Sequence, residues 1–180
     1  MVTPTQPDAV PQPHADRMTP FAGHPIVAGI TPSRPDLVIR TAAGWASSLG
    51  VAVHFAYADP SRYVVRELRG GSVQHSDLNP DAADDAWRER ERQLRSRVAE
   101  LVDPDLTWEF HYLAGRPDRA LTHLARAVDA AALVVGTRTG RGSGWHELLD
   151  GAVGSHLAHH QHRPVLLVPL SVVDWKTPLP

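Results

Sequence analysis

The feature that most constrains the fold of this chain is a repeated alternation of short apolar runs with longer amphipathic segments. A short apolar run is typical of a strand that is buried on both faces, and apolar residues at helical spacing indicate a helix with one face on the core. The predicted strands lie at residues 25–30, 51–58, 106–114, 131–136 and 163–170, and the predicted helices at 33–50, 81–101, 117–128 and 150–160.

Strands that alternate with helices predict an α/β fold with a doubly wound, five-stranded parallel sheet and helices on both faces. Ligands of such sheets bind beyond the carboxyl ends of the strands, at the point where the strand order switches. One segment departs from the alternation. The stretch "RYVVRELRGGSVQHS" carries two β-prone runs around Gly70 and Gly71, which predicts a hairpin insertion within residues 60–80.

The pattern places one folded domain at residues 25–172. Residues 1–24 hold five prolines and little apolar periodicity, so they are expected to form a disordered tail. The alternative is an arm that docks on the domain or on a partner. Residues 173–180 are expected to form a C-terminal extension.

The composition argues against several classes of function. The net charge of −2 shows no electrostatic footprint for nucleic acid, and no apolar run is long enough to span a membrane. Cysteine is absent, which removes disulfides, thiolate catalysis and cysteine metal sites and favours a cytoplasmic protein.

Glycine is concentrated after the fourth predicted strand, in "GTRTGRGSGWHELLDGAV" (residues 136–153), where a ligand of such a sheet would lie. Together with "VVGTR", "LLDGAV", "HRPVLLVP", "GRPDRALTHLA" and "PIVAGITPS", this loop resembles the universal stress protein family over about residues 25–170. The extension "YADPSRYVV" and the ending "LAHHQHRPV" are similar to a bacterial subgroup. The resemblance implies an adenine nucleotide α-hydrolase-like fold with strand order 3-2-1-4-5, and a homodimer through the strand at residues 163–170.

The resemblance also implies a nucleotide site, because some members of the family bind ATP. Their loop reads Gly, two residues, Gly, nine residues, then Gly followed by Ser or Thr, so that backbone N–H groups approach the phosphates. Here the glycines map to Gly136, Gly140 and Gly151, each gap is one residue longer, and the hydroxyl position is Ala152. The Asp of the first turn maps to Thr31. The residues implied for binding are Thr31, Tyr57, Gly136, Arg138, Gly140, Arg141, Gly142, Gly151, Ala152 and Val153.

These departures predict weak binding of ATP or a related adenine nucleotide. Losing a hydroxyl donor costs about 1 kcal/mol, and losing a hydrogen bond made by a charged group about 1.5–3 kcal/mol. The sum corresponds to roughly two to three decades of affinity. Arg138 and Arg141 are either phosphate ligands that offset the loss or solvated loop charges.

Three functions follow from these residues. The first is a dimeric stress-response protein that senses an adenine nucleotide or another small ligand. The second is a nucleotide-free dimer that acts through protein partners, and the third is a weak ATP hydrolase. No catalytic residue is assigned, because no motif orders the nearby Thr31, Ser33, Ser143, His146 and Glu147 into a relay.

No metal is expected beyond a nucleotide-bound Mg²⁺. Four histidines gather at the end of the last predicted helix, but no carboxylate lies among them, and they are interpreted as a helix ending. These histidines are His156, His159, His160 and His162.

Overall fold

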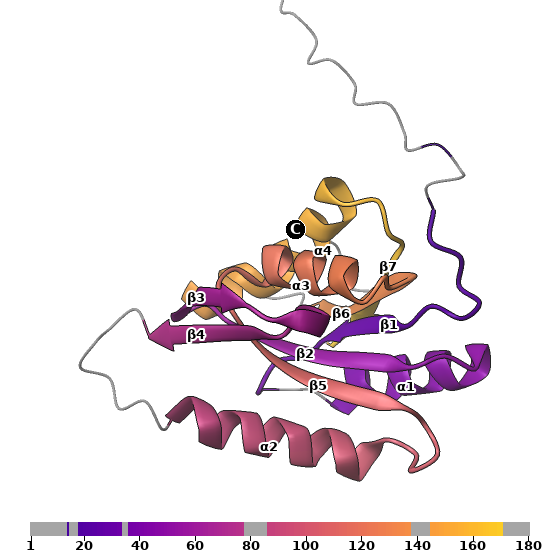
Figure 1. Ribbon diagram of the computed structural model, residues 1–180, viewed down its shortest axis with the longest axis horizontal. Coiled ribbons are helices and arrows are strands. Elements are labelled where there is room, and N and C mark those ends of the chain that lie inside the picture. Colours follow the sequence, from indigo (N-terminus) through magenta and orange to yellow (C-terminus); the bar gives the residue numbers. More distant parts are fainter. Residues whose placement is uncertain (1–13, 15–17, 34–35, 78–85, 138–144, 171–180) are drawn as a thin grey trace, which may run out of the picture.

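The structure is a computed structural model that describes residues 14, 18–33, 36–77, 86–137 and 145–170 (Figure 1). The strands are β1 (Ile26–Gly29), β2 (Val53–Asp59), β3 (Arg62–Glu67), β4 (Val73–Asp77), β5 (Trp108–Ala114), β6 (Ala132–Thr137) and β7 (Val165–Pro169). The α-helices are α1 (Asp36–Leu49), α2 (Ala86–Leu101), α3 (Pro117–Ala127) and α4 (Trp145–His160), and a short 3₁₀ turn, η2 (Arg69–Gly71), joins β3 to β4.

Five strands form one parallel sheet in the order β5-β2-β1-β6-β7. In order of the strands predicted from the sequence this is 3-2-1-4-5, so the predicted fold is confirmed. Figure 1 shows α1 and α2 on one face of the sheet and α3 and α4 on the other. The strand order reverses between β1 and β6, which places the switch point at the carboxyl ends of these two strands.

The central strand β1 explains why the apolar runs lack polar alternation. Ile26 and Ala28 pack into the core beneath α1, whereas Val27 packs into a second core with Leu121 and Leu124 of α3. The three strand residues are fully buried, so both faces of β1 exclude water. Burial of apolar surface on both sides is the main favourable term for such a strand.

The hairpin β3–β4 forms a separate two-stranded sheet, and its strands pack beside β5. Its turn lies against α3: a Cβ added at Gly71 would lie 2.5 Å from Leu124 Cδ1, and the φ angle of Gly71 is 79°. Glycine is therefore required there both by the backbone conformation and by the neighbouring helix.

Part of the predicted tail contacts the domain. The ring of Phe21 lies 5.9 Å from that of Trp45, and His24 Nδ1 lies 3.1 Å from the backbone carbonyl oxygen of Asp129. Residues 1–13 and 15–17 lie outside the described residues, so the predicted disorder of this part stays a prediction.

The last helix differs from the prediction. It begins at Trp145, not near residue 150, because the segment "WHELL" has no proline or β-branched residue and places Glu147 in the first turn, where a carboxylate is favourable. Gly151 and Ala152, which the prediction put in the first turn of this helix, thus lie in its second turn, and His146 and Glu147 lie on α4 and not in a loop. In the part of the chain described here, no helix has the length and apolar character needed to cross a membrane.

Candidate functional site

A cavity of about 520 Å³ opens at the carboxyl ends of β1, β2 and β6. One wall is the turn after β1, from Ile30 to Ser33, and another is the end of β2 with Pro60 and Ser61. Pro117 and Leu121 of α3 contribute from one face of the sheet and Val38 of α1 from the other. The cavity therefore lies at the switch point, where ligands of doubly wound sheets bind.

The structure brings four of the residues implied by the family resemblance to this cavity. Thr31, Tyr57, Gly136 and Val153 all line it. Gly151 and Ala152 lie two and one residues before Val153 in α4. The remaining four, Arg138, Gly140, Arg141 and Gly142, lie outside the described residues, so their part in a phosphate loop stays a prediction.

Gly136 has a packing role in the structure. It lies in β6, and a Cβ added there would lie 2.6 Å from Leu170 Cδ1 and 3.2 Å from Val38 Cγ2. Any larger residue would have to displace Leu170, which itself lines the cavity. Packing against Leu170 and Val38 is therefore sufficient to explain a glycine at this position, without a bound phosphate.

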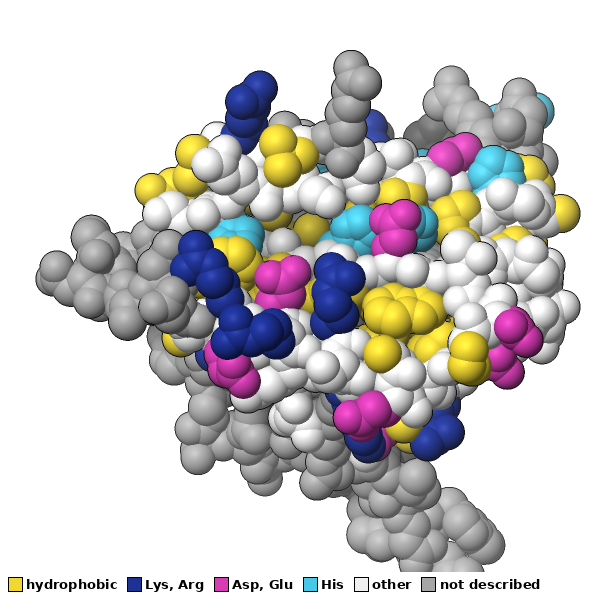
Figure 2. Space-filling view, turned by 60° about the horizontal axis from the view of Figure 1, so that its bottom comes forward, with side chains coloured by type: hydrophobic (Ala, Val, Ile, Leu, Met, Phe, Trp, Pro, Cys, Tyr) yellow, Lys and Arg dark blue, Asp and Glu magenta, His cyan; other side chains and the backbone are white. Residues whose placement is uncertain are grey.

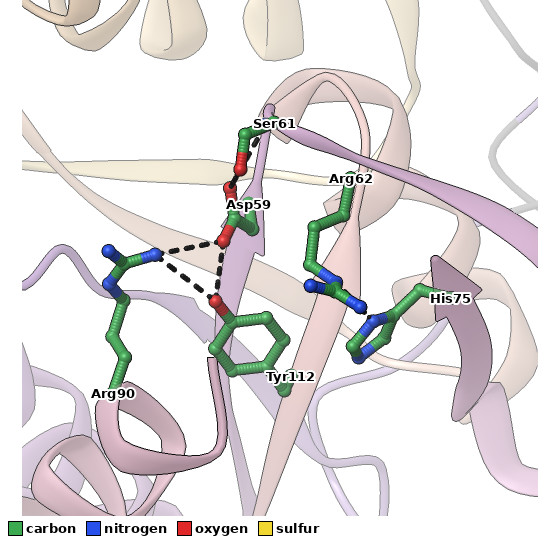
Figure 3. Close-up of polar contacts among 6 residues, drawn as sticks. All are labelled: Asp59, Ser61, Arg62, His75, Arg90 and Tyr112. Carbon is green, nitrogen blue, oxygen red and sulfur yellow. Dashed lines mark hydrogen bonds and ion pairs between the residues drawn. The ribbon is translucent and has the colours of Figure 1, made fainter. Parts of the chain in front are cut away.

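A buried carboxylate, Asp59, lies at the end of β2 on the cavity wall. Its Oδ2 accepts hydrogen bonds from Tyr112 Oη at 2.5 Å and from Arg90 Nη1 at 2.9 Å, and its Oδ1 accepts bonds from the hydroxyl and the backbone N–H of Ser61 at 2.6 and 3.0 Å (Figure 3). Burial opposes ionisation of Asp59, but the bonds from Ser61 and Tyr112 and the charge of Arg90 outweigh it, so its pKa lies below the ordinary value. Asp59 is therefore an ionised group that is fixed in place.

Arg90 reaches the cavity from α2, and the hairpin helps to hold that helix in position. Trp87, one turn earlier, packs edge-on against His75 of β4 at 4.6 Å and lies 5.6 Å from the Tyr112 ring. His75 Nδ1 in turn accepts a hydrogen bond of 2.6 Å from Arg62 Nε (Figure 3). The insertion thus joins α2 to the end of the sheet that carries the cavity.

Tyr57 presents an aromatic ring to the same cavity. Its ring contacts that of Tyr112 edge-on at 5.3 Å, and the Arg90 guanidinium lies 6.0 Å from its centroid. An aromatic wall beside a cation suits a flat ring that carries an anionic group.

Of the two charged groups of this site, one could have been identified from the sequence and the other could not. Asp59 follows an apolar run directly, at the carboxyl end of a predicted strand, so the general rule for ligand sites in parallel sheets could have identified it. Arg90 is one of many charges on a solvated helix and carries no such signal.

A second polar cluster lies away from the cavity, between β2 and β5, and the sequence analysis did not identify it. His54 Nδ1 lies 3.0 Å from His111 Nε2, and Glu109 Oε2 lies 3.7 Å from the former atom and 3.6 Å from the latter. Burial lowers the pKa of both imidazoles, that of His111 to about 4. The sequence held one indication of this cluster. Each histidine lies inside a predicted strand, at a position where an apolar residue is expected.

The histidines at the end of α4 lie farther from one another than those between β2 and β5. The rings of His156 and His160 are 5.7 Å apart. The carboxylate near them, Asp118, has its Oδ2 3.9 Å from His156 Nδ1 and is also paired with Arg116 at 2.9 Å. Nothing in this arrangement departs from the predicted helix ending.

Comparisons with known proteins support the fold and the family. A family model, the universal stress protein family, matches residues 25–169. Comparison with curated protein sequences gave no match.

Several solved structures are similar to the chain. A universal stress protein from Archaeoglobus fulgidus is 21% identical, with a TM-score of 0.54 over 82% of this chain and 94% of that one. A universal stress protein from the same organism in complex with dAMP is 20% identical, with a TM-score of 0.52 over 81% and 97%. A universal stress protein in complex with cAMP is 23% identical, with a TM-score of 0.55 over 83% and 99%.

Proposed function

The chain belongs to the universal stress protein family, and we propose that it is a cytoplasmic, homodimeric member that binds an adenine nucleotide weakly and does not turn it over. The observation that carries the proposal is the cavity of about 520 Å³ at the switch point of the sheet. Two proteins of similar structure are complexes with dAMP and with cAMP. Their shared chemistry, an adenine ring on a pentose that carries a phosphate, is the ligand class proposed here.

The walls of the cavity suit the parts of such a ligand. Ile30, Val38 and Tyr57 offer apolar and aromatic surface to a purine. Thr31 and Ser33 carry hydroxyl groups in the turn after β1, and their oxygens lie 3.5 Å apart. Arg90 lines the cavity and uses Nη1 in its bonds to Asp59 and Tyr112. The guanidinium has further N–H groups, and we expect these to donate to an anionic ligand.

The same wall limits the affinity. Thr31 stands where the resemblance implies a carboxylate, and the Ala152 side chain has no hydroxyl. Leu170 packs against Gly136, the first glycine of the implied phosphate loop. The lost polar contacts weaken binding by roughly two to three decades relative to a site that has them.

The described wall also supports binding without turnover. Its charged side chains are Asp59 and Arg90, and these are engaged with each other. A general base needs a group that is placed to accept a proton from the attacking water, and Asp59 already accepts four hydrogen bonds. We expect phosphate release from ATP to stay at the rate of the buffer blank.

A nucleotide-free interaction module is the second candidate, because a specific observation favours it. Leu170 packs against the backbone that a phosphate would have to approach. In addition, the edge strand β7 exposes Leu166 and Leu167, which are 37% and 45% accessible. An open strand edge with exposed apolar residues favours pairing with another chain, as in the proposed homodimer.

A matched pair of tyrosine variants tests the proposed site by calorimetric titration with ATP. Tyr57→Ala removes the ring at the cavity and is expected to weaken binding about three- to tenfold, the worth of an aromatic contact. Tyr63→Ala removes a ring that is 47% exposed on β3, and it should leave the affinity unchanged. Equal affinity in both variants would place the nucleotide elsewhere and reject the site.

A further inference from the structure

We propose that His54, Glu109 and His111 form a binding site for a divalent transition metal, with Zn²⁺ as the preferred ion. The three side chains lie on β2 and β5, toward the amino ends of these strands, whereas the nucleotide cavity lies at the carboxyl ends. The proposal concerns a different part of the sheet from the proposed function and does not depend on it.

The pairing of the two strands brings the ligands together. His54 is in register with Glu109, and His111 lies two residues further along β5, opposite Ala56. Because side chains alternate along a strand, all three project from one face of the sheet, and Phe55 and Phe110 project into the core on the other. Each residue therefore reaches the same point without any distortion of the strands.

The separations of the donor atoms match a metal site. The nitrogens of the two histidines are 3.0 Å apart, and the Glu109 oxygen lies 3.7 and 3.6 Å from them. Tetrahedral Zn²⁺, with bonds of about 2.0–2.2 Å to nitrogen and oxygen, holds its ligand atoms roughly 3.3 Å apart. Shifts of a few tenths of an ångström in the side chains would give this geometry.

The chemistry of the three groups also fits. Two imidazoles and one carboxylate are ligands that Zn²⁺ accepts, and three protein ligands leave a fourth position for water. The Glu109 side chain is 66% accessible, so the cluster opens to solvent on one side. On the face seen in Figure 2, histidine side chains lie beside an acidic side chain at the surface.

Packing alone does not account for the cluster. His111 is 5% accessible, and its Nδ1 has no hydrogen-bond partner among the described residues. Burial of an unsatisfied polar atom is unfavourable, so an apolar residue would be more stable at this strand position unless the imidazole has a use. A metal would bind through Nε2, which faces His54 and Glu109, and would leave Nδ1 unchanged. A hydrogen bond between the two histidines would lock β2 to β5, but it requires neither the neighbouring carboxylate nor the opening to solvent.

The test uses the full chain without an affinity tag, stripped with EDTA and then dialysed. Titration with ZnCl₂ is expected to show one equivalent bound per chain in the low micromolar range or tighter. Titration with CoCl₂ should give the intense visible absorption of tetrahedral cobalt. Binding only at millimolar zinc, or a weak octahedral cobalt spectrum, would overturn the proposal.

Two variants assign the binding to these residues. Glu109→Gln changes a side chain that is 66% accessible, so we expect the fold to be retained. The variant should weaken zinc binding at least about tenfold, which is already the typical effect of losing an outer-shell partner. The double variant His156→Ala/His160→Ala removes the other histidine pair and should bind zinc as the wild type does. Loss of the site in the double variant, with full affinity in Glu109→Gln, would place the metal at the end of α4 and reject the proposal.

A stability readout complements the titration. Saturating ZnCl₂ is expected to raise the thermal midpoint of the wild type, because the ion binds the folded state and links β2 to β5. The midpoint of Glu109→Gln should match the wild type without zinc and should shift less with zinc. Equal shifts in both proteins would contradict the assignment.

Discussion

At the scale of single residues, the cavity has a carboxylate at Asp59 and none at position 31, where the family resemblance implies one. The turn after β1 carries Thr31 where the family resemblance implies Asp, and Asp59 supplies a carboxylate from the end of β2. The two positions are not equivalent. Asp59 is 3% accessible, and Ser61, Tyr112 and Arg90 occupy its oxygens, so it orders the wall and holds Arg90.

Thr31→Asp is therefore expected to tighten binding of ATP. A charged acceptor that bonds to the ligand contributes about 1.5–3 kcal/mol, which corresponds to a gain of roughly ten- to a hundredfold in affinity. Thr107→Asp makes the same chemical change at an exposed position directly before β5, at the opposite end of the sheet, and serves as the control. Calorimetric titration of both variants checks the effect, and equal affinities would contradict the position assigned to Thr31.

Asp59→Asn tests the buried carboxylate through the pH dependence of stability. The pKa of Asp59 is lower in the folded state than its ordinary value of 3.8, so its charge stabilises the fold above pH 3.8 and this contribution is lost as pH falls through the folded-state pKa. At pH 7 the variant is expected to be less stable by about 1–3 kcal/mol.

Urea denaturation at pH 7 and pH 3 measures the difference. The gap between the wild type and Asp59→Asn should narrow at the lower pH, because the carboxyl group of the unfolded chain is then mostly protonated and part of the stabilisation by the charge is lost. A gap that is constant with pH would show that Asp59 contributes only through its shape.

At the scale of the elements, the apolar runs were sufficient to predict the sheet. A strand that is buried on both faces is an unbroken apolar run, which can be recognised without knowing its neighbours in space. Val27 and Ile26 face different cores, and the sequence shows this as an unbroken apolar run. The start of α4 was misplaced because the glycines of residues 136–153 suggested a loop. The cluster at His54 and His111 was missed because it forms only when β2 pairs with β5, and a single sequence does not show register.

The contact between the hairpin and α3 gives a prediction at this scale. Gly71→Ala would place a Cβ 2.5 Å from Leu124 Cδ1 and 3.2 Å from Ala127 Cβ, whereas Gly70→Ala meets nothing within 4 Å. Both glycines have positive φ angles, 79° and 73°, so both variants carry backbone strain of about 1 kcal/mol. Gly71→Ala is expected to be less stable than Gly70→Ala by about a further 1–3 kcal/mol, from overpacking.

Urea denaturation of the two variants at one pH isolates the packing contribution. Equal stabilities would show that the turn does not press against α3.

At the scale of the whole molecule, the sheet has two edges of different character. The hairpin packs beside the β5 edge. On the other side β7 is the last strand among the residues that the structure describes, and its Leu166 and Leu167 are exposed. An open edge is stabilised by pairing with a second strand, and a twofold axis perpendicular to β7, beside its edge, would pair it with the same strand of a second copy. The homodimer that the family resemblance implies stays a prediction, and β7 is the strand that it would use.

Leu166→Lys is expected to convert the proposed dimer into a monomer, because a charge on an edge strand opposes pairing with another strand. Leu49→Lys, on α1, replaces a leucine of similar exposure, 38% against 37%, and should leave the dimer intact. Light scattering coupled to size-exclusion chromatography measures the mass of each. A monomeric wild type, or a dimeric Leu166→Lys variant, would contradict an interface through β7.

The central claim is that the cavity at the switch point binds an adenine nucleotide weakly. Calorimetric titration of the wild type with ATP, AMP and cyclic AMP, with and without Mg²⁺, tests it most directly. The account predicts saturable binding of one nucleotide per chain, in the range from micromolar to about millimolar that follows from the lost polar contacts. No heat of binding up to several millimolar nucleotide would contradict the claim and favour the nucleotide-free interaction module.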